Sequence, residues 1–218
     1  MLHDIDIREP LFDFLEEKFG KTRIIEEKVI GKSRADILMV TGNALIGIEI
    51  KSDADTYVRL SGQVKNYDKF FDYNYLVVGT KHARGAADHV PAYWGIITVE
   101  DVLGKPDFYV LRGAGKNPKM KLRYKLSLIW RPELAILQEL NNMPKYKQKS
   151  KADLIKAFIE RTEYPEDKKG YISTEVLTKQ ISDVLFERDY NQIGETIEEY
   201  RKQNSNRTGR KKGRKKRF

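Results

Sequence analysis

Three charged side chains lie in apolar segments of the chain, where burying a charge without a partner or a function is costly. Asp36 opens one apolar run, and Glu49 and Lys51 stand at the end of the next. Residues two apart on a strand point to the same side, so Glu49 and Lys51 share a face if this run is a strand. If residues 41–44 form a turn that pairs the two runs as a hairpin, Asp36 lies near the same end of the sheet.

Two carboxylates and a lysine at one end of a sheet suit metal-dependent hydrolysis. Converging carboxylates form a hard oxygen site of the kind that Mg²⁺ prefers. The metal can hold a phosphate oxygen and lower the pKa of its bound water, and a neighbouring lysine can orient that water. Asp36, Glu49 and Lys51 therefore indicate phosphodiester hydrolysis. The alternative is a structural ion-pair cluster on a half-exposed sheet.

The elements that would carry these residues follow from the spacing of apolar side chains. Apolar residues after Pro10 recur at helical spacing up to Gly20, which predicts a first helix with the proline in its first turn. Three short β-branched runs then predict an antiparallel meander, and a helical pattern over 56–71 follows. Two more runs, 75–78 and 93–97, predict strands. The expected order is α-β-β-β-α-β-β, an α/β fold whose mixed sheet is flanked by helices.

The rest of the chain differs from this region in composition. Residues 116–129 alternate basic and apolar side chains, which fits a strand with a basic face or an extended linker, and helical spacing returns after Pro132. The expected organisation is a sheet domain over 1–111, a basic connecting segment over 112–131, a small all-helical module over 132–200 and a disordered basic tail over 201–218.

The charge of the chain is concentrated rather than spread. The sequence holds 41 Lys and Arg against 32 Asp and Glu, a net charge of +9. Residues 201–218 alone hold ten basic side chains and no acidic one. Such a tail can bind nucleic acid by releasing counterions, with Arg210, Lys211 and Lys212 as candidate contacts. The alternatives are a solubilising tail or, in a eukaryotic setting, a localisation signal.

Composition also excludes several kinds of protein. The chain contains no cysteine, which excludes disulfides, thiolate zinc sites and cysteine nucleophiles. Its first residues lack the pattern of a secretory signal, and no apolar run approaches the ~20 residues needed to span a bilayer. We therefore expect a cytoplasmic protein with no membrane partner.

The motifs around the charged residues resemble those of the PD-(D/E)xK, or restriction-endonuclease-like, nuclease superfamily. The resemblance rests on Ala35-Asp36, on Glu49-Ile50-Lys51-Ser52 and on Gln63-Val64-Lys65-Asn66-Tyr67, the Gln-x-x-x-Tyr motif of a subset of these nucleases. It covers roughly residues 4–100, and Ala35 replaces the proline of the superfamily name. The chain also resembles a family of small, poorly characterised bacterial and phage proteins assigned to that superfamily.

This resemblance implies roles for individual residues. Asp36 and Glu49 would bind Mg²⁺ or Mn²⁺, with the carbonyl of Ile50 as a further ligand, and Lys51 would be the catalytic lysine. Gln63 would contact the metal-bound water or the lysine. Tyr67, one helical turn further along, would contact the DNA backbone. The fold implied is the α-β-β-β-α-β core of the superfamily.

A third acidic ligand is less sharply indicated. If Gly31-Lys32 is a two-residue hairpin turn, the resulting register places Glu27 opposite Asp36, which makes Glu27 the preferred candidate. Glu9, near the start of the first helix, is the alternative, because related enzymes often supply an acid from that helix.

The residues around the proposed site complete the functional prediction. Arg34 and Arg59 flank it and could bind phosphate, with surface ion pairs as the alternative. The sequence predicts a Mg²⁺-dependent deoxyribonuclease, with RNA not excluded as substrate. Two other hypotheses stay open: a nucleic-acid-binding protein that does not cleave, and a phage or host regulatory protein that binds a partner through its helical module.

Overall fold

The computed structural model describes residues 2–146 and 148–188, and within them six strands form one mixed sheet. The strands are β1 (Arg23–Ile30), β2 (Ser33–Val40), β3 (Leu45–Lys51), β4 (Tyr73–Gly79), β5 (Gly95–Val102) and β6 (Lys105–Arg112). The helices are α1 (Asp4–Phe19), α2 (Leu60–Phe70), α3 (Thr80–Ala83), α4 (Ala86–His89), α5 (Leu122–Ser127), α6 (Arg131–Leu140), α7 (Lys151–Thr162) and α8 (Thr174–Phe186).

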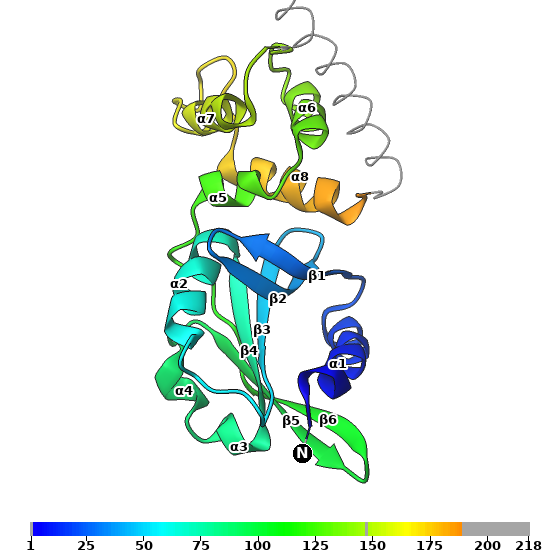
Figure 1. The fold of residues 1–218 in the computed structure, drawn as a ribbon. Coiled ribbons are helices and arrows are strands. Elements are labelled where there is room, and N and C mark those ends of the chain that lie inside the picture. The colour runs from blue at the N-terminus through cyan, green and yellow to red at the C-terminus, as the bar shows by residue number, and fades with distance from the viewer. Residues whose placement is uncertain (1, 147, 189–218) are drawn as a thin grey trace, which may run out of the picture.

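The sheet follows the chain order from β1 to β6 (Figure 1). β1, β2 and β3 pair antiparallel, β3, β4 and β5 pair parallel, and β6 returns antiparallel to β5. The predicted mixed α/β sheet with an α-β-β-β-α-β core is therefore confirmed. The tight turn at Gly31, whose φ is 62°, sets the predicted register of β1 and β2, with Ile30 opposite Ser33 and Lys28 opposite Ala35.

β3 lies inside the sheet, and all seven of its residues are buried. One face of the sheet packs on α1 through Ile7, Leu11 and Leu15, while the other packs on α2 (Figure 1). Gly47 of β3 allows α2 to approach closely, because a Cβ there would overlap the rings of Phe71 and Tyr67. The strand that carries two of the candidate site residues is thus enclosed on both faces.

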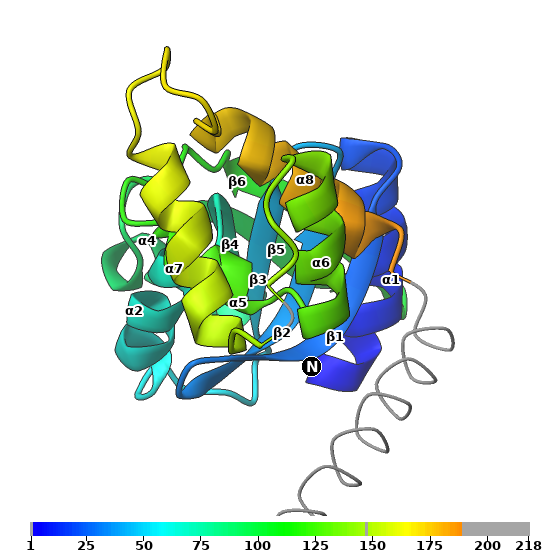
Figure 2. The same cartoon turned by 90° about the horizontal axis from the view of Figure 1, so that it is seen from above.

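Helices α5 to α8 lie over one end of the sheet, next to β1, β2 and α2 (Figures 1 and 2). Their apolar side chains, among them Leu126, Phe158 and Ile181, belong to the same buried cluster as Leu60 of α2. A buried ion pair between Lys125 of α5 and Asp72 also joins this part to the sheet. The division of the chain at 111, 131 and 200 stays a prediction.

Three local expectations are wrong. α1 begins at Asp4 rather than at the proline, because the backbone N–H of His3 donates to Asp6 Oδ2 (2.8 Å) in a capping box, and Pro10 lies inside the helix. Strand β6 was not expected. Part of the segment expected as strand or linker forms α5, where the alternation of basic and apolar residues fails to separate outside from inside because Lys125 is buried.

Part of the sequence prediction lies outside the described residues. This applies to the basic tail over 201–218 and to its candidate contacts Arg210, Lys211 and Lys212. Among the helices that the structure describes, none is long and apolar enough to cross a membrane.

Candidate active site

A cavity of about 690 Å³ opens where α1, the ends of β1 to β3 and α2 meet. The cavity is lined by most of the side chains that the sequence singled out, namely Glu27, Arg34, Asp36, Glu49, Ile50, Lys51, Arg59 and Gln63. Asp4 and Arg8 of α1 line it as well, and the sequence motifs pointed to neither of them. Residues from five separate elements are therefore brought to one place.

Glu49 is the most enclosed charged group of the cavity, with no exposed surface. Its Oε1 accepts hydrogen bonds from Lys51 Nζ and from Gln63 Nε2. Its Oε2 accepts a hydrogen bond of 2.7 Å from the hydroxyl of Tyr67. Burial of this carboxylate is thus offset by three donors, and the same contacts hold Lys51 and Gln63 against it.

Tyr67 lies beneath the cavity and connects three elements. Its hydroxyl accepts a hydrogen bond from the backbone N–H of Asp36 (3.1 Å) and lies 3.1 Å from the carbonyl oxygen of Ile48. Burial, followed by the charges of Glu49 and Asp36, raises the pKa of Tyr67 well above its ordinary value, so the side chain stays a neutral donor. The expected DNA contact does not fit this position, because the residue has no exposed surface; it orients Glu49 instead.

Asp36 faces Glu49 across the β2–β3 pair. Its Oδ2 accepts a hydrogen bond of 2.8 Å from the backbone N–H of Ile50. Burial, and then the negative charge of Glu49, raises the pKa of Asp36 to about 7, although the Ile50 amide, Lys51 and Arg8 act in the opposite direction. Two carboxylates held close together with little solvent screening favour a cation between them.

Arg8 places a positive charge on the α1 side of the cavity. Its Nε lies 2.6 Å from Asp4 Oδ2, and its Nη2 lies 2.8 Å from Glu27 Oε1 and 3.8 Å from Asp36 Oδ1. Burial alone would lower the pKa of Arg8, but the hydrogen bond and charge of Asp4 and the charges of Asp36 and Glu27 raise it. The four-residue spacing of Asp4 and Arg8 was the available signal, and it is visible only if the helix begins before Pro10.

Glu27 lies where the hairpin register placed it, between the pairs Glu26–Ile37 and Lys28–Ala35. Its φ of 52° departs from strand geometry, and its carboxylate forms ion pairs with Arg8 and Arg34. The alternative candidate, Glu9, is exposed on α1 and does not line the cavity. The identity of a third acidic ligand stays a prediction.

The donor set fits a hard divalent cation, with part of the shell left to other ligands. Asp36 and Glu49 offer two carboxylates, and Ile50 lines the same cavity. Within residues 2–146 and 148–188, no three His, Cys, Asp or Glu side chains come together as a ready metal cluster. A Mg²⁺ ion commonly binds one or two carboxylates and keeps several waters, so two carboxylates and a carbonyl suffice.

Comparison with known proteins gives one family match over most of the chain. The model of the family described as bacteriophage P4 protein cII matches residues 2–202. No curated protein matches the chain. Among solved structures, SfsA of Pyrococcus furiosus in complex with Ca²⁺ is similar at 17% identity and a TM-score of 0.30, over 51% of this chain and 60% of that one.

Proposed function

The chain belongs to the bacteriophage P4 protein cII family, and we propose that it is a metal-dependent nuclease that hydrolyses DNA phosphodiester bonds. The observation that carries the proposal is the meeting of Asp36, Glu49, Lys51 and Gln63 around one cavity. The order of helices and strands supports membership of the PD-(D/E)xK superfamily, whose core has the same α-β-β-β-α-β succession.

The roles of the residues follow from their contacts. Asp36 and Glu49 would hold Mg²⁺ or Mn²⁺, which when bound polarises a phosphate oxygen and lowers the pKa of a coordinated water. Lys51 keeps its ammonium beside Glu49, where it can orient the attacking water and offset charge that develops on the phosphate. Gln63 and Tyr67 fix the orientation of the Glu49 carboxylate. Arg34 and Arg59, exposed at the rim, would hold flanking phosphates.

A nucleic-acid-binding protein that does not cleave is the second candidate. One observation favours it: Arg8 already places a fixed cation among Asp4, Glu27 and Asp36. In that case the acidic cluster would be neutralised by arginine and would need no metal ion. The two candidates differ in whether a divalent cation changes the protein or its substrate.

The test is incubation of the purified chain with single-stranded, duplex and branched DNA and with RNA, in Mg²⁺, Mn²⁺ or EDTA. We expect cleavage that requires the divalent cation and that falls by about 10²-fold or more in Asp36→Ala and in Lys51→Ala, because each removes a group that acts on the reacting water or phosphate.

The matched control is Lys65→Ala, an exposed lysine of α2 outside the cavity, which should cut like the unchanged chain. Cleavage that persists in both site variants would place the chemistry elsewhere. Absence of cleavage on every substrate would favour the binding protein.

A further inference from the structure

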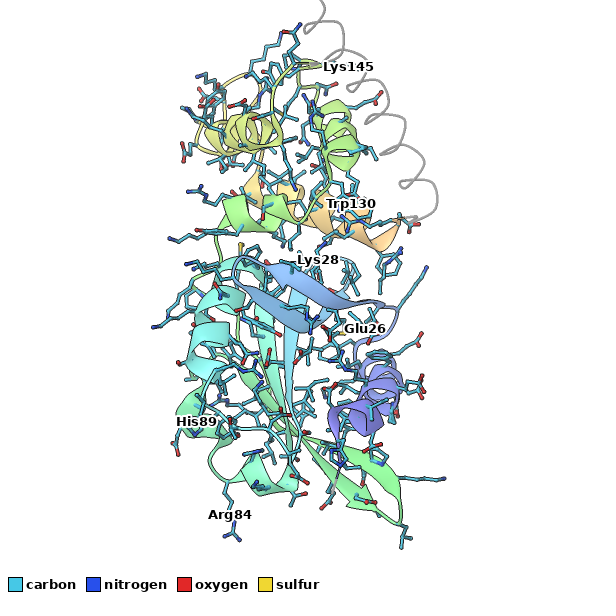
Figure 3. The ribbon with its side chains drawn as sticks, in the orientation of Figure 1. Glu26, Lys28, Arg84, His89, Trp130 and Lys145 are labelled. Atoms are coloured by element: carbon cyan, nitrogen blue, oxygen red, sulfur yellow. The ribbon has the colours of Figure 1, made fainter. Side chains whose placement is uncertain are left out.

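A second cavity, of about 460 Å³, lies where β1 and the end of α2 meet α5, the segment before α6, and α7. Lys28 and Trp130 approach each other across this junction from β1 and from the start of α6 (Figure 3). The described side chains that line the cavity include three cations, Lys28, Arg123 and Lys151, and no carboxylate. The first cavity, by contrast, is lined by carboxylates as well as cations. The second one is therefore suited to an anion.

The positive charges of this region are held together at a cost. Burial, and then the charge of Arg188, lowers the pKa of Lys28 to about 8, and Lys151 acts in the same direction. Burial also lowers the pKa of Lys151, with Arg188 acting in the same direction. Glu133 opposes both shifts, but its two oxygens already accept from Arg188 Nε and Nη2, each at 2.6 Å. The Glu133 carboxylate is thus the counter-charge of three cations, Lys28, Lys151 and Arg188. A bound anion would relieve the remaining repulsion between these cations.

Both lysine side chains are partly withdrawn from solvent. Lys151 Nζ donates to the carbonyl oxygen of Ser127 at 2.6 Å, which fixes it between α5 and α7. Lys28 extends from the β1 strand and is half-buried. Because both side chains are already partly ordered, an anion that binds them loses less conformational entropy than one bound by exposed lysines.

Aromatic rings lie beside these cations. Phe70, Tyr124 and Trp130 line the cavity, with the rings of Phe70 and Tyr124 5.2 Å apart. The Arg123 guanidinium lies 5.4 Å from the Tyr124 ring. Cations for the backbone and aromatic faces for the bases are the combination by which proteins hold single-stranded nucleic acid.

The two cavities lie on either side of the β1–β2 turn. Ser33 lines the first and Gly31 lines the second. On α2, Asn66 lines the first and Phe70, one helical turn later, lines the second. A nucleic-acid strand that lies in the first cavity therefore needs only to cross this turn to reach the second cavity.

We propose that the second cavity binds a phosphate and an adjacent base of a single nucleic-acid strand that runs from the candidate active site across the β1–β2 turn. The path of the strand rests on the proposed function, whereas binding in the cavity does not require cleavage. Lys28, Lys151 and Arg123 contact the phosphate, and the Tyr124 and Trp130 rings contact the base.

The test is fluorescence anisotropy of a labelled oligothymidylate with the full chain in EDTA, so that no cleavage occurs, over a range of salt concentrations. The double variant Lys28→Gln, Lys151→Gln is expected to bind about tenfold or more weakly, and its salt slope should fall by about 0.7 for each phosphate that is no longer neutralised. Arg123→Gln, which changes an exposed residue, should weaken binding in the same direction.

The matched control is Lys156→Gln on the same helix α7, whose side chain is 78% exposed and lies outside the cavity. An equal loss in this control would mean a general charge effect and would overturn the proposal. Unchanged affinity in both cavity variants would overturn it as well. A polyglutamate peptide that competes as well as the oligonucleotide would assign the cavity to an acidic protein segment instead.

Trp130 offers a direct signal of occupancy. The chain has two tryptophans, and Trp94 is completely buried in the core. Oligothymidylate should therefore quench the part of the tryptophan fluorescence that Trp130→Phe removes. If the fluorescence of the unchanged chain stays constant at saturating oligothymidylate, base contact is contradicted. If no substrate is cleaved while the cavity variants still weaken binding, the nuclease proposal fails and this one stands. If cleavage depends on Asp36 but the cavity variants bind normally, this proposal fails and the nuclease proposal stands.

Discussion

Glu49 uses both of its carboxylate oxygens within the protein, whereas Asp36 directs one oxygen to the Ile50 amide and the other toward Arg8 at 3.8 Å. The two residues are therefore not equivalent. Glu49 is held by its hydrogen-bond donors. The cost of burying negative charge at the site falls on Asp36, as its raised pKa indicates. A group kept in place despite such a cost is a feature of functional sites.

This cost predicts the effect of Asp36→Asn on stability without metal. The pKa of Asp36 in the folded chain, about 7, exceeds the ordinary value of 3.8, so the folded chain binds this proton more tightly than the unfolded chain does. The resulting stabilisation is fully present below about pH 4 and is lost as the pH rises through 7. Above that pH the asparagine variant should be more stable than the unchanged chain, by at least about 1 kcal/mol or about 2–4 °C in Tm.

The measurement is thermal unfolding in EDTA between about pH 4 and 8, compared with the same series in Mg²⁺. Metal should stabilise the unchanged chain and not the variant. A difference between the two proteins that stays constant with pH would show that Asp36 does not carry the repulsion.

At the scale of residues, sequence reasoning found the groups on the strands and missed those on the helix. Asp36, Glu49 and Lys51 could be found because charges inside apolar runs are conspicuous. Asp4 and Arg8 could not, because an acid and a base four residues apart on a helix usually form a surface ion pair. Only the packing of α1 against the sheet brings them to the cavity.

At the scale of elements, predictions succeeded where one side of an element is apolar. β1 to β4 and α2 have such a pattern. In β6, Tyr109 and Leu111 are exposed although they are apolar, so alternation could not identify the strand, and the turn at Leu103-Gly104 was the remaining signal. In α5 the buried residues are Lys125 and Leu126, and the charge of Lys125 hid the inner face of the helix.

The ion pair of Lys125 predicts a large effect on stability. Its Nζ contacts Asp72 Oδ2, and its side chain has no exposed surface, so Lys125→Met would leave Asp72 buried with the Leu45 amide as its remaining donor. The expected loss is about 3–5 kcal/mol, because removing one partner strands the other charge. Urea unfolding measures it, with the exposed Lys65→Met as control. A loss below about 1 kcal/mol would mean that Asp72 is reached by water.

At the scale of the molecule, positive charge is concentrated in the segment that follows a slightly acidic sheet region. Residues 112–151 hold eleven basic and two acidic side chains, and both Arg123 and Lys151 of the second cavity belong to this segment. Since α5 to α8 share a buried cluster with α2, the charges of Arg123 and Lys151 stand at a defined place beside the candidate active site.

A further run of basic side chains, in residues 201–218, lies outside the described residues. Deletion of residues 201–218 removes ten basic side chains and should weaken DNA binding and flatten its salt dependence, by about 0.7 to 0.9 in slope for each phosphate that the tail neutralises. Cleavage at saturating DNA should be unchanged. Salt titrations of Kd beside single-turnover assays measure both quantities. Loss of cleavage at saturation would instead place the tail in the chemistry.

Gly47 has a consequence for how related genes are interpreted. Any side chain there would push against Tyr67 and Phe71, and Tyr67 holds the Glu49 carboxylate. A relative that keeps every acid and lysine of the motif but carries a larger residue at this position would have an intact signature and a displaced carboxylate. We expect such a gene to encode an inactive protein. A motif search limited to charged residues would nevertheless count it among the active ones.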